Sequence, residues 1–463
     1  MTTDSFITSG KLTTVTINEL QQVFEGKILV ESDTDYEKAR KVWNGMIDRR
    51  PAIIAQCLCI NDIVQAVKFA RKYNLLVSVK GGGHNVTGNA VCDDGIMIDL
   101  SLMRSIRVDP ENQVAEVQPG ATWGDFDNAT QQHGLASTGG LISTTGVAGL
   151  TLGGGVGWLV RKHGLSCDNL IEAEIVTAEG ELLKVNTEEN AELFWGIRGG
   201  GGNFGVIASM KFRVHKLDKV TGGMILHPHT KAKEVIQFYR EFMKTAPDEL
   251  TLYTCLMTTP DGFPVIAFVG CYSGDPGKAE AVLKPLREFG SPLADLMQPK
   301  SYIEMQTMLD APFPHGNRYY WKSGFLETLS DEAIDIIVSN AASVTSPYSA
   351  IILEYYGGVS SHEPEGGTSY PHRQAEFDLV LISNWVDREE DEKNINWTRK
   401  FYEAMQVYSS HRVYVNALGI EGEERVKEAY GESYQRLTAL KTKYDPENLF
   451  RMNQNISPVQ AGM

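Results

Sequence analysis

Residues 80–89 read KGGGHNVTGN, and the interpretation of the whole chain starts from this stretch. Glycine lets backbone amides approach a ligand closely and adopt positive φ. Rows of exposed amides form concavities that bind anions, above all diphosphates. The histidine directly after the three glycines, His84, is a candidate for a loop residue, a metal ligand, a base or a point of attachment.

Two further glycine clusters follow. Residues 139–158 read GGLISTTGVAGLTLGGGVGW and residues 198–205 read RGGGGNFG. The second cluster contains a formal G-x-G-x-x-G match, but a strand is expected after it, whereas the dinucleotide fingerprint requires a helix. The P-loop sequence does not occur. The clusters predict a nucleotide held by several loops, and a tight turn between strands is the alternative for any single cluster.

Bulk properties exclude several classes of protein. The chain has 463 residues, of which 42% are hydrophobic, and cores rarely grow as one unit beyond about 250–300 residues, so two domains are expected. The net charge of −16 disfavours nucleic-acid partners. No apolar run approaches the roughly 18–20 residues that span a bilayer, and no secretory signal is visible. We expect a cytoplasmic protein that binds no membrane and whose six cysteines are ordinary thiols.

Periodicity and turn residues predict the local structure of the first half of the chain. A helix is expected over 61–74, beginning at an Asn-Asp cap, and a second over 122–134, capped by Thr122. Further expected elements are strands at 75–80 and 205–217, three short strands within 95–119, a hairpin over 170–185 and a short helix over 190–197.

The character of the sequence changes after about residue 219. The glycine clusters stop, and a helical stretch at 231–244 alternates with strand-like runs at 264–272 and 349–358. This pattern indicates a second domain of mixed helices and strands.

Local chemistry alone leaves the role of His84 open. No set of His, Cys or Asp residues near it has the spacing of metal ligands, so no metal site is predicted. The nucleophile motif G-x-S-x-G is absent. From the local sequence, a histidine that helps to hold a phosphate-binding loop is favoured.

The order of the motifs gives more information. The chain carries RRPAIIAQCLCINDIVQAVKFARKYNLLVSVKGGGHNVTGNAV, then GIMIDLSLM, GVAGLTLGGGVGWLVRKHGLSCDNL and LFWGIRGGGGNFGVI, and finally YVN and KYDPENLFRMNQNISP. In this order it resembles the berberine-bridge-enzyme-like branch of the vanillyl-alcohol-oxidase superfamily of flavoproteins, and within that branch it is similar to the bacterial hydroxynicotine oxidases. The resemblance covers nearly the whole chain.

The resemblance implies an α+β fold of two domains. Residues 1–218 are expected to form an FAD-binding domain of the vanillyl-alcohol-oxidase type. Residues 219–410 are expected to form a substrate-binding domain with an antiparallel sheet. Residues 411–463 are expected to return to the FAD domain.

The resemblance also implies FAD with a single covalent link, from a ring nitrogen of His84 to the 8-methyl carbon. Ile142 falls where many members carry a second, cysteine tether, and Cys167 does not match that position. The other residues expected to contact the cofactor are Lys80, Gly81, Gly82, Gly83, Asn85, Gly88, Asn89, Thr145, Gly146, Gly149, Gly153, Gly154, Gly157, Asn203, Gly205, Val206 and, from the tail, Asn453.

Four residues are implied in catalysis. Tyr414 matches the tyrosine base of a family Y-x-N strand, with Asn416 as its hydrogen-bond partner. Because a free tyrosine titrates near ~10, a base needs a nearby cation or hydrogen-bond donors, and Lys322 is the candidate cation. Tyr356, together with Glu354, aligns with substrate-facing residues, although both fit a plain sheet as well.

Two positions depart from the family pattern: Ala417 replaces a tyrosine, and Val380 falls where berberine bridge enzyme has its glutamate base. His372 is expected to be structural or on the surface.

The expected function follows from this site. We expect an FAD-dependent oxidase that takes hydride from a C–OH or C–N substrate to flavin N5, with O2 as acceptor and H2O2 as product. A dehydrogenase with another electron acceptor and a non-catalytic flavin-bearing protein are the alternatives. The sequence names neither the small-molecule substrate nor the oligomeric state.

Overall fold

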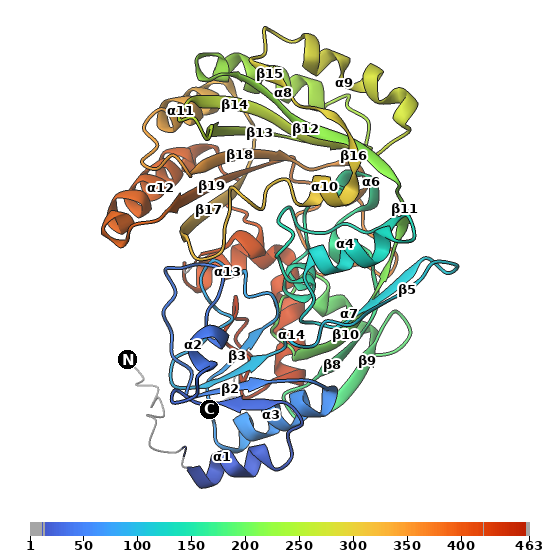
Figure 1. The fold of residues 1–463 in the computed structure, drawn as a ribbon, viewed down its shortest axis with the longest axis vertical. Helices are drawn as coiled ribbons and strands as arrows, with labels where there is room; N and C mark the ends of the chain where they lie inside the picture. Colours follow the sequence, from blue (N-terminus) through green and yellow to red (C-terminus); the bar gives the residue numbers. More distant parts are fainter. Residues whose placement is uncertain (1–11, 13, 420, 460–463) are drawn as a thin grey trace.

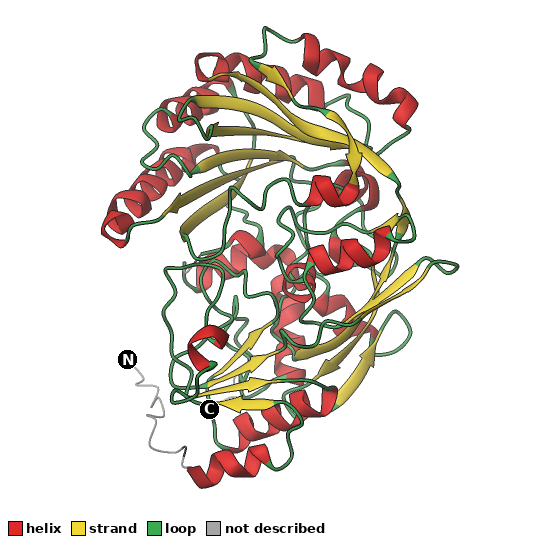
Figure 2. Cartoon of the chain, in the orientation of Figure 1, coloured by secondary structure: helices red, strands yellow, loops and turns green. Residues whose placement is uncertain are grey.

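The computed structural model describes residues 12, 14–419 and 421–459. In this part of the chain two smaller sheets are formed by residues 27–213 and one large sheet by residues 219–385. Figure 1 shows the large sheet above the two smaller ones, and Figure 2 shows that helices and strands alternate in both parts. The fold is therefore α+β, as the sequence predicts.

The first small sheet has the order β1-β2-β4-β3, in which β4 pairs in parallel with both β2 and β3. Its strands are β1 (Lys27–Leu29), β2 (Ile53–Gln56), β3 (Val77–Lys80) and β4 (Ile96–Asp99). The helices of this region are α1 (Thr14–Gln21), α2 (Tyr36–Ala39) and α3 (Ile60–Lys72). The strand β3 runs directly into the glycine loop that begins at Gly81.

The expected cap of α3 is wrong. The helix begins at Ile60 with Cys59 as its N-cap. The carboxylate of Asp62 lies in the first turn and accepts hydrogen bonds from the backbone N–H groups of Glu25, Gly26 and Leu58. Asp62 therefore ties the start of α3 to the preceding chain.

The second small sheet is antiparallel, with the order β5-β6-β10-β8-β9. Its strands are β5 (Ile106–Asp109), β6 (Val114–Val117), β8 (Leu170–Val176), β9 (Leu182–Val185) and β10 (Val206–Arg213). A two-stranded ribbon pairs β7 (Leu135–Ala136) with β11 (His215–Lys216), so the strand expected over 205–217 is divided in two. The associated helices are α4 (Trp123–Gln131), α5 (Val147–Leu152), α6 (Val160–His163) and α7 (Ala191–Ile197). Thr122 caps α4 as predicted, in a capping box with Asp125.

The large sheet has eight antiparallel strands in the described residues, in the order β15-β12-β14-β13-β18-β19-β17, with β16 also paired to β12. The strands are β12 (Lys219–Pro228), β13 (Leu250–Thr258), β14 (Pro264–Tyr272), β15 (Ala294–Asp295), β16 (Gln298–Ser301), β17 (Arg318–Leu326), β18 (Ala350–Tyr355) and β19 (Phe377–Trp385). The helices are α8 (Ala232–Met243), α9 (Ala279–Glu288), α10 (Tyr302–Gln306), α11 (Asp331–Ala341) and α12 (Asp391–Met405). Four of these, α8, α9, α11 and α12, pack on one face of the sheet in a common core, and Figure 1 shows them on its outer side.

The C-terminal segment lies in the lower part of the molecule (Figure 1). It contains α13 (Glu423–Tyr430) and α14 (Tyr434–Tyr444). Val413, Val415, Leu437 and Ile456 belong to the same buried core as the strands β8 and β10. The segment therefore contributes to the core next to the glycine loops. Within the described residues, no helix has the length and apolar character that a membrane crossing needs.

Candidate active site

A cavity lies between the glycine loops and the inner face of the large sheet, opposite the face covered by helices. The loops contribute Gly81 to Asn85 and most residues of the stretch 140–153, and the third cluster contributes Gly201, Gly202 and Gly205. The large sheet contributes Trp321, Ile352, Glu354, Asp378, Val380 and Ile382. The C-terminal segment contributes Tyr414 to Ala417, Phe450 and Met452 to Gln454. The cavity is thus built from segments that are far apart in the sequence.

The lower wall of the cavity is largely bare backbone. A Cβ on Gly82 would lie 2.4 Å from the amide nitrogen of Gly146, so the first two glycine loops touch where any side chain would separate them. A Cβ on Gly149 or Gly202 would meet nothing within 4 Å, because both glycines face open space. Such a wall accepts a flat ligand with a diphosphate directly on the backbone. The residues present therefore fit FAD.

Most of the residues expected to contact the cofactor line this cavity. They are Gly81, Gly82, Gly83, His84, Asn85, Asn89, Thr145, Gly146, Gly149, Gly153, Gly205, Val206 and Asn453.

Lys80 and Gly88 do not line the cavity. Lys80 follows Val79 on β3, and adjacent residues of a strand point to opposite faces. Val79 faces the cavity, whereas the Lys80 ammonium donates to the carbonyl of Ala39 at 2.6 Å. Gly88 packs against the side chain of Ile47. A contact of these two residues with the cofactor stays a prediction, which their position outside the cavity lining does not support.

Gly154, Gly157 and Asn203 also do not line the cavity, and their contact with the cofactor stays a prediction. Gly154 contacts the ring of Tyr370, and Gly157 lies against the carbonyl of Gly139. The buried amide of Asn203 donates to the carbonyls of Gly200 and Gln454 and accepts from the N–H of Ile456. These residues hold neighbouring segments together and so support the wall.

His84 lies half-buried in the cavity wall as a neutral imidazole. Its Nε2 lies 2.7 Å from Thr144 Oγ1, and its Nδ1 lies 3.5 Å from Thr145 Oγ1. Burial, together with nearby His315, lowers the pKa of His84 to about 3. A neutral imidazole keeps a nitrogen lone pair, which is the form that attacks an electrophilic carbon.

A stack of rings that sequence reasoning missed extends from His84 to the large sheet. The ring of Trp43 stacks on His84 at 4.9 Å between centroids and on Tyr319 at 3.7 Å. The neighbouring Asn44 donates to the carbonyl of Tyr319 at 2.9 Å and accepts from its N–H at 3.0 Å. Asp310, which precedes β17, accepts from the N–H and Oγ of Ser143 at 2.8 and 2.6 Å. These contacts place the large sheet directly beside His84.

Tyr414 and Asn416 lie together on a second side of the cavity, as expected. The segment forms a 3₁₀ turn at Val415–Ala417, so the strand expected there is wrong. The Tyr414 oxygen accepts hydrogen bonds from the N–H of Gly155 and from Asn416 Nδ2, both at 2.8 Å. Burial raises the pKa of Tyr414 above its usual value despite these two donors. Tyr414 is therefore a neutral phenol in this environment.

Lys322 is not the cation beside Tyr414, and this expectation is corrected. The adjacent residues Trp321 and Ser323 face the cavity side of β17, so Lys322 points to the opposite face. Its ammonium pairs with Glu421 at 2.8 Å. Successive side chains of a strand point to opposite faces, and this alternation turns Lys322 away from the cavity.

Two buried carboxyl groups, Glu354 and Asp378, form a third side of the cavity. They are direct neighbours across β18 and β19. Tyr356 does not line the cavity; its hydroxyl lies 3.0 Å from Glu354 Oε2 and 3.3 Å from Asp378 Oδ2. Burial and the neighbouring Asp378 raise the pKa of Glu354 to about 8, and burial raises the pKa of Asp378 to about 7. Asp378 was missed in the sequence, where its only signal is an acid at the start of an apolar strand.

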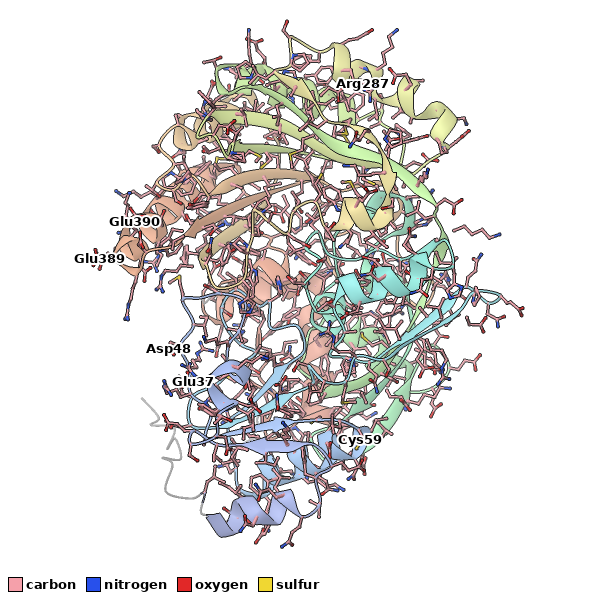
Figure 3. The ribbon with its side chains drawn as sticks, in the orientation of Figure 1. Glu37, Asp48, Cys59, Arg287, Glu389 and Glu390 are labelled. Atoms are coloured by element: carbon pink, nitrogen blue, oxygen red, sulfur yellow. The ribbon has the colours of Figure 1, made fainter. Side chains whose placement is uncertain are left out.

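Most other acidic side chains lie at the periphery of the molecule, as Glu37, Asp48 and Glu389 do in Figure 3. Glu354 and Asp378 belong to the few acids that are buried, and among the described residues they are the only acids that line the cavity. His372, expected to be structural or on the surface, is buried and contacts the carbonyl of Ala429 through Nε2 at 2.8 Å.

A buried ion pair lies just before the part of the tail that lines the cavity. Lys441, at 0% side-chain exposure, pairs with Asp445 at 2.7 Å and donates to the carbonyls of Asn203 and Phe450. Asn453 donates to the carbonyls of Gly202 and Phe450, and its Oδ1 is buried without a protein partner in the described structure. A free acceptor at the cavity wall suits an N–H donor of a bound ring.

Comparison with known proteins agrees with this geometry. The model of the FAD binding domain family matches residues 51–186, and the model described as berberine and berberine like matches residues 413–457. An FAD-linked oxidoreductase of Dictyostelium discoideum is 33% identical over 96% of this chain and 97% of its own length. (R)-6-hydroxynicotine oxidase of Paenarthrobacter nicotinovorans is 30% identical over 94% of this chain and 97% of its own length.

The solved structures include a similar fold. The crystal structure of 6-hydroxy-D-nicotine oxidase from Arthrobacter nicotinovorans has a TM-score of 0.86 at 29% identity, covering 94% of this chain and 98% of that one. Fold and cavity together define an FAD-dependent oxidoreductase. The chain belongs to the berberine-bridge-enzyme-like family of FAD-linked oxidoreductases, whose members act on small molecules.

Proposed function

We propose that this enzyme is an oxidase with FAD bound through one covalent link to His84, that it oxidises a C–OH or C–N group, and that O2 is its electron acceptor. When bound, FAD supplies a hydride acceptor. The observation that carries the proposal is the half-buried neutral imidazole of His84 in the wall of a glycine-lined cavity.

A single link is supported by the surroundings of His84. Ile142 lines the cavity where a second tether would start. Cys167 is fully buried beside Asp168 and does not line the cavity. Burial raises the pKa of the Cys167 thiol well above its usual value, so the thiolate needed for attachment is disfavoured.

Tyr414 and Asn416 are the groups that we propose contact the reacting O–H or N–H. Both line the cavity, and their mutual hydrogen bond fixes the position of the phenol oxygen. Because burial raises the pKa of Tyr414, its first role is to position substrate as a neutral hydrogen-bonding group.

A cytoplasmic location of the enzyme stays a prediction.

The covalent link is tested by acid precipitation of the purified holoenzyme. A yellow pellet, and a tryptic peptide that contains His84 and carries the mass of FAD, are expected. A colourless pellet under a yellow supernatant would overturn the link to His84. Flavin on a peptide that contains Cys167 would overturn the single attachment.

The acceptor is tested separately. After anaerobic reduction, admission of O2 is expected to restore the oxidised flavin and yield one H2O2 per flavin. If O2 restores the flavin only slowly while a quinone does so at once, the enzyme is a dehydrogenase.

A further inference from the structure

We propose that Glu354 and Asp378 form a carboxyl pair that shares one proton, binds the cationic nitrogen of a small apolar amine and accepts its proton before oxidation. The inference rests on the proposed function and narrows its substrate from C–OH or C–N compounds to amines. It assigns a proton acceptor that is distinct from Tyr414.

The geometry of the strands brings the two acids together. Glu354 on β18 and Asp378 on β19 are paired in register, which puts their Cβ atoms about 4.5–5.5 Å apart on the same face. Tyr356 Oη lies within hydrogen-bonding distance of both groups, and Ser323 Oγ lies 3.4 Å from Asp378 Oδ2. Two carboxylates this close in a buried site do not both ionise, so the pair retains one proton and one negative charge.

One oxygen of the pair is left for a ligand. Asp378 is 0% exposed, and its Oδ1 has no hydrogen-bond partner in the described structure. Leaving a buried acceptor unpaired costs free energy, which a ligand N–H donor recovers. Both Glu354 and Asp378 line the cavity, so this acceptor lies where a substrate binds.

The other walls select the rest of the ligand. Among the described residues that line the cavity, Glu354 and Asp378 are the only acids, and none is lysine or arginine. The neighbouring wall is apolar and aromatic: Phe313, Trp321, Ile352, Val380 and Ile382. A negative site in an apolar pocket attracts a cation with an apolar body, and an anionic substrate finds no counter-charge there.

Protons and electrons balance in this scheme. The ammonium R2NH2+ gives one proton to the pair, which becomes fully protonated and neutral, and the free amine is left. The amine then loses hydride from its α-carbon to the flavin and becomes an iminium cation, which water hydrolyses to a carbonyl compound and an amine. The pair returns its extra proton to solvent, and O2 takes the two electrons as H2O2.

The test uses the holoenzyme under anaerobic conditions with three probes. N-methylbenzylamine is the cationic probe, benzyl methyl ether is its neutral isostere, and 1-phenylethanol is a neutral alcohol. Binding is read from the perturbation of the flavin spectrum, and oxidation is read from bleaching of the flavin. The variants are Glu354→Gln, Asp378→Asn and the double variant, which change charge with little change of shape. Glu376→Gln removes an exposed acid just before β19 and serves as the matched control.

The double variant is expected to weaken binding of N-methylbenzylamine about tenfold or more, equivalent to about 1.4 kcal/mol or more, and to abolish bleaching by the amine. Binding of benzyl methyl ether is expected to change less than about threefold. Either single variant retains one acid and is expected to keep binding but slow bleaching. Glu376→Gln is expected to match the wild type. Equal weakening of the amine and the ether, or no weakening of either, would overturn the proposal.

The two proposals fail in distinguishable ways. If 1-phenylethanol bleaches the wild-type flavin and the amine does not, the amine inference is wrong and the oxidase function stands. If no probe bleaches the flavin, and a panel of amines, alcohols and sugars does not either, the oxidase function fails. Charge-selective binding in the double-variant series would then still show the cation site.

Discussion

At the scale of single residues, the hydrogen bond between Thr144 and His84 decides which ring nitrogen is free. If Thr144 Oγ1 accepts the Nε2–H, the lone pair lies on Nδ1, whose nearest hydroxyl, that of Thr145, is 3.5 Å away. We infer that Thr144 is a positioning residue for the proposed attachment, because this hydrogen bond would fix the tautomer of the imidazole.

Replacement of Thr144 by valine keeps the shape of the side chain and removes this hydrogen bond. We expect Thr144→Val to slow covalent attachment about tenfold or more when FAD is added to the apoprotein, because the imidazole loses its fixed tautomer and orientation. The measurement is the fraction of flavin that stays in the acid pellet over time. Thr144→Ser restores the hydroxyl and is expected to restore the rate. Equal rates for Thr144→Val and the wild type would refute the role.

The Tyr414 hydroxyl is tested by removing one oxygen atom. We expect Tyr414→Phe to lower kcat/KM about 10²-fold, a typical loss for a group that handles a reacting proton or its partner, while the flavin stays attached. Steady-state H2O2 production measures the effect. Tyr370→Phe is the control, since the buried Tyr370 hydroxyl has no partner in the described structure and its ring lies 6.1 Å from that of Tyr414. A similar loss in both variants would point to packing.

The buried carboxyl pair also makes a prediction for stability. Because the pKa values of Glu354 and Asp378 are raised in the folded protein, to about 8 and about 7, the folded state holds protons that the unfolded state releases at lower pH. Their contribution is most favourable below the unfolded pKa values near 4 and is lost as pH rises toward 8. The titratable groups around the pair are tyrosines, all of which stay neutral in this range because burial raises their pKa values. They are Tyr239, Tyr253, Tyr356, Tyr370 and Tyr414.

Relative to the wild type, we therefore expect the Glu354→Gln, Asp378→Asn double variant to gain stability between about pH 5 and about pH 8. The gain in the free energy of unfolding should be about 1 kcal/mol or more. Urea denaturation of both proteins at the two pH values measures it. A difference that does not depend on pH would show that the two acids titrate normally.

At the scale of elements, sequence patterns predicted the positions of the glycine loops and of most helices and strands, because residues close together in the chain determine these elements. The capping box at Thr122 is one example. Lys80 does not line the cavity and Lys322 points away from Tyr414, because side chains alternate along a strand. This alternation becomes informative once the face that lines the cavity is known. Asp378 was missed because its partner, Glu354, is set by the register of β18 against β19, a tertiary property.

The tail contains a buried ion pair that helps to position it. Lys441 on α14 holds Asp445, the carbonyl of Asn203 and the carbonyl of Phe450, and the residues after Phe450 line the cavity. We expect Lys441→Met to destabilise the fold by about 3–5 kcal/mol, because it leaves Asp445 buried without its counter-charge. Thermal unfolding measures the loss.

Lys443→Met is the matched control, since it removes an exposed lysine from the same helix and should cost less than about 0.5 kcal/mol. Adding Asp445→Asn to Lys441→Met removes the uncompensated charge and should recover part of the stability. A double variant that is no more stable than Lys441→Met would contradict this explanation.

At the scale of the whole molecule, the cavity exists only because two parts of the chain are held together. The family resemblance anticipates this arrangement, and the boundaries near residues 218 and 411 stay a prediction. Several contacts that hold the parts together come from loops, which have no periodicity in the sequence, and others come from helices, such as that of Arg161 on α6 with the carbonyl of Leu250. The buried Arg373, in the loop between β18 and β19, makes two hydrogen bonds to Asp168 in the lower part, at 2.7 and 2.6 Å.

This contact predicts how the molecule unfolds. Replacement of Arg373 by methionine leaves the Asp168 carboxylate buried without its partner, which should cost about 3–5 kcal/mol. Because the contact joins the large sheet to the lower part, we expect Arg373→Met to separate one thermal transition into two in calorimetry. Arg436→Met removes the exposed pair with Glu192 and should lower stability by at most about 1 kcal/mol, with a single transition. A single transition in Arg373→Met, shifted to lower temperature, would mean that the remaining contacts, including Asp310 with Ser143, suffice to couple the two parts.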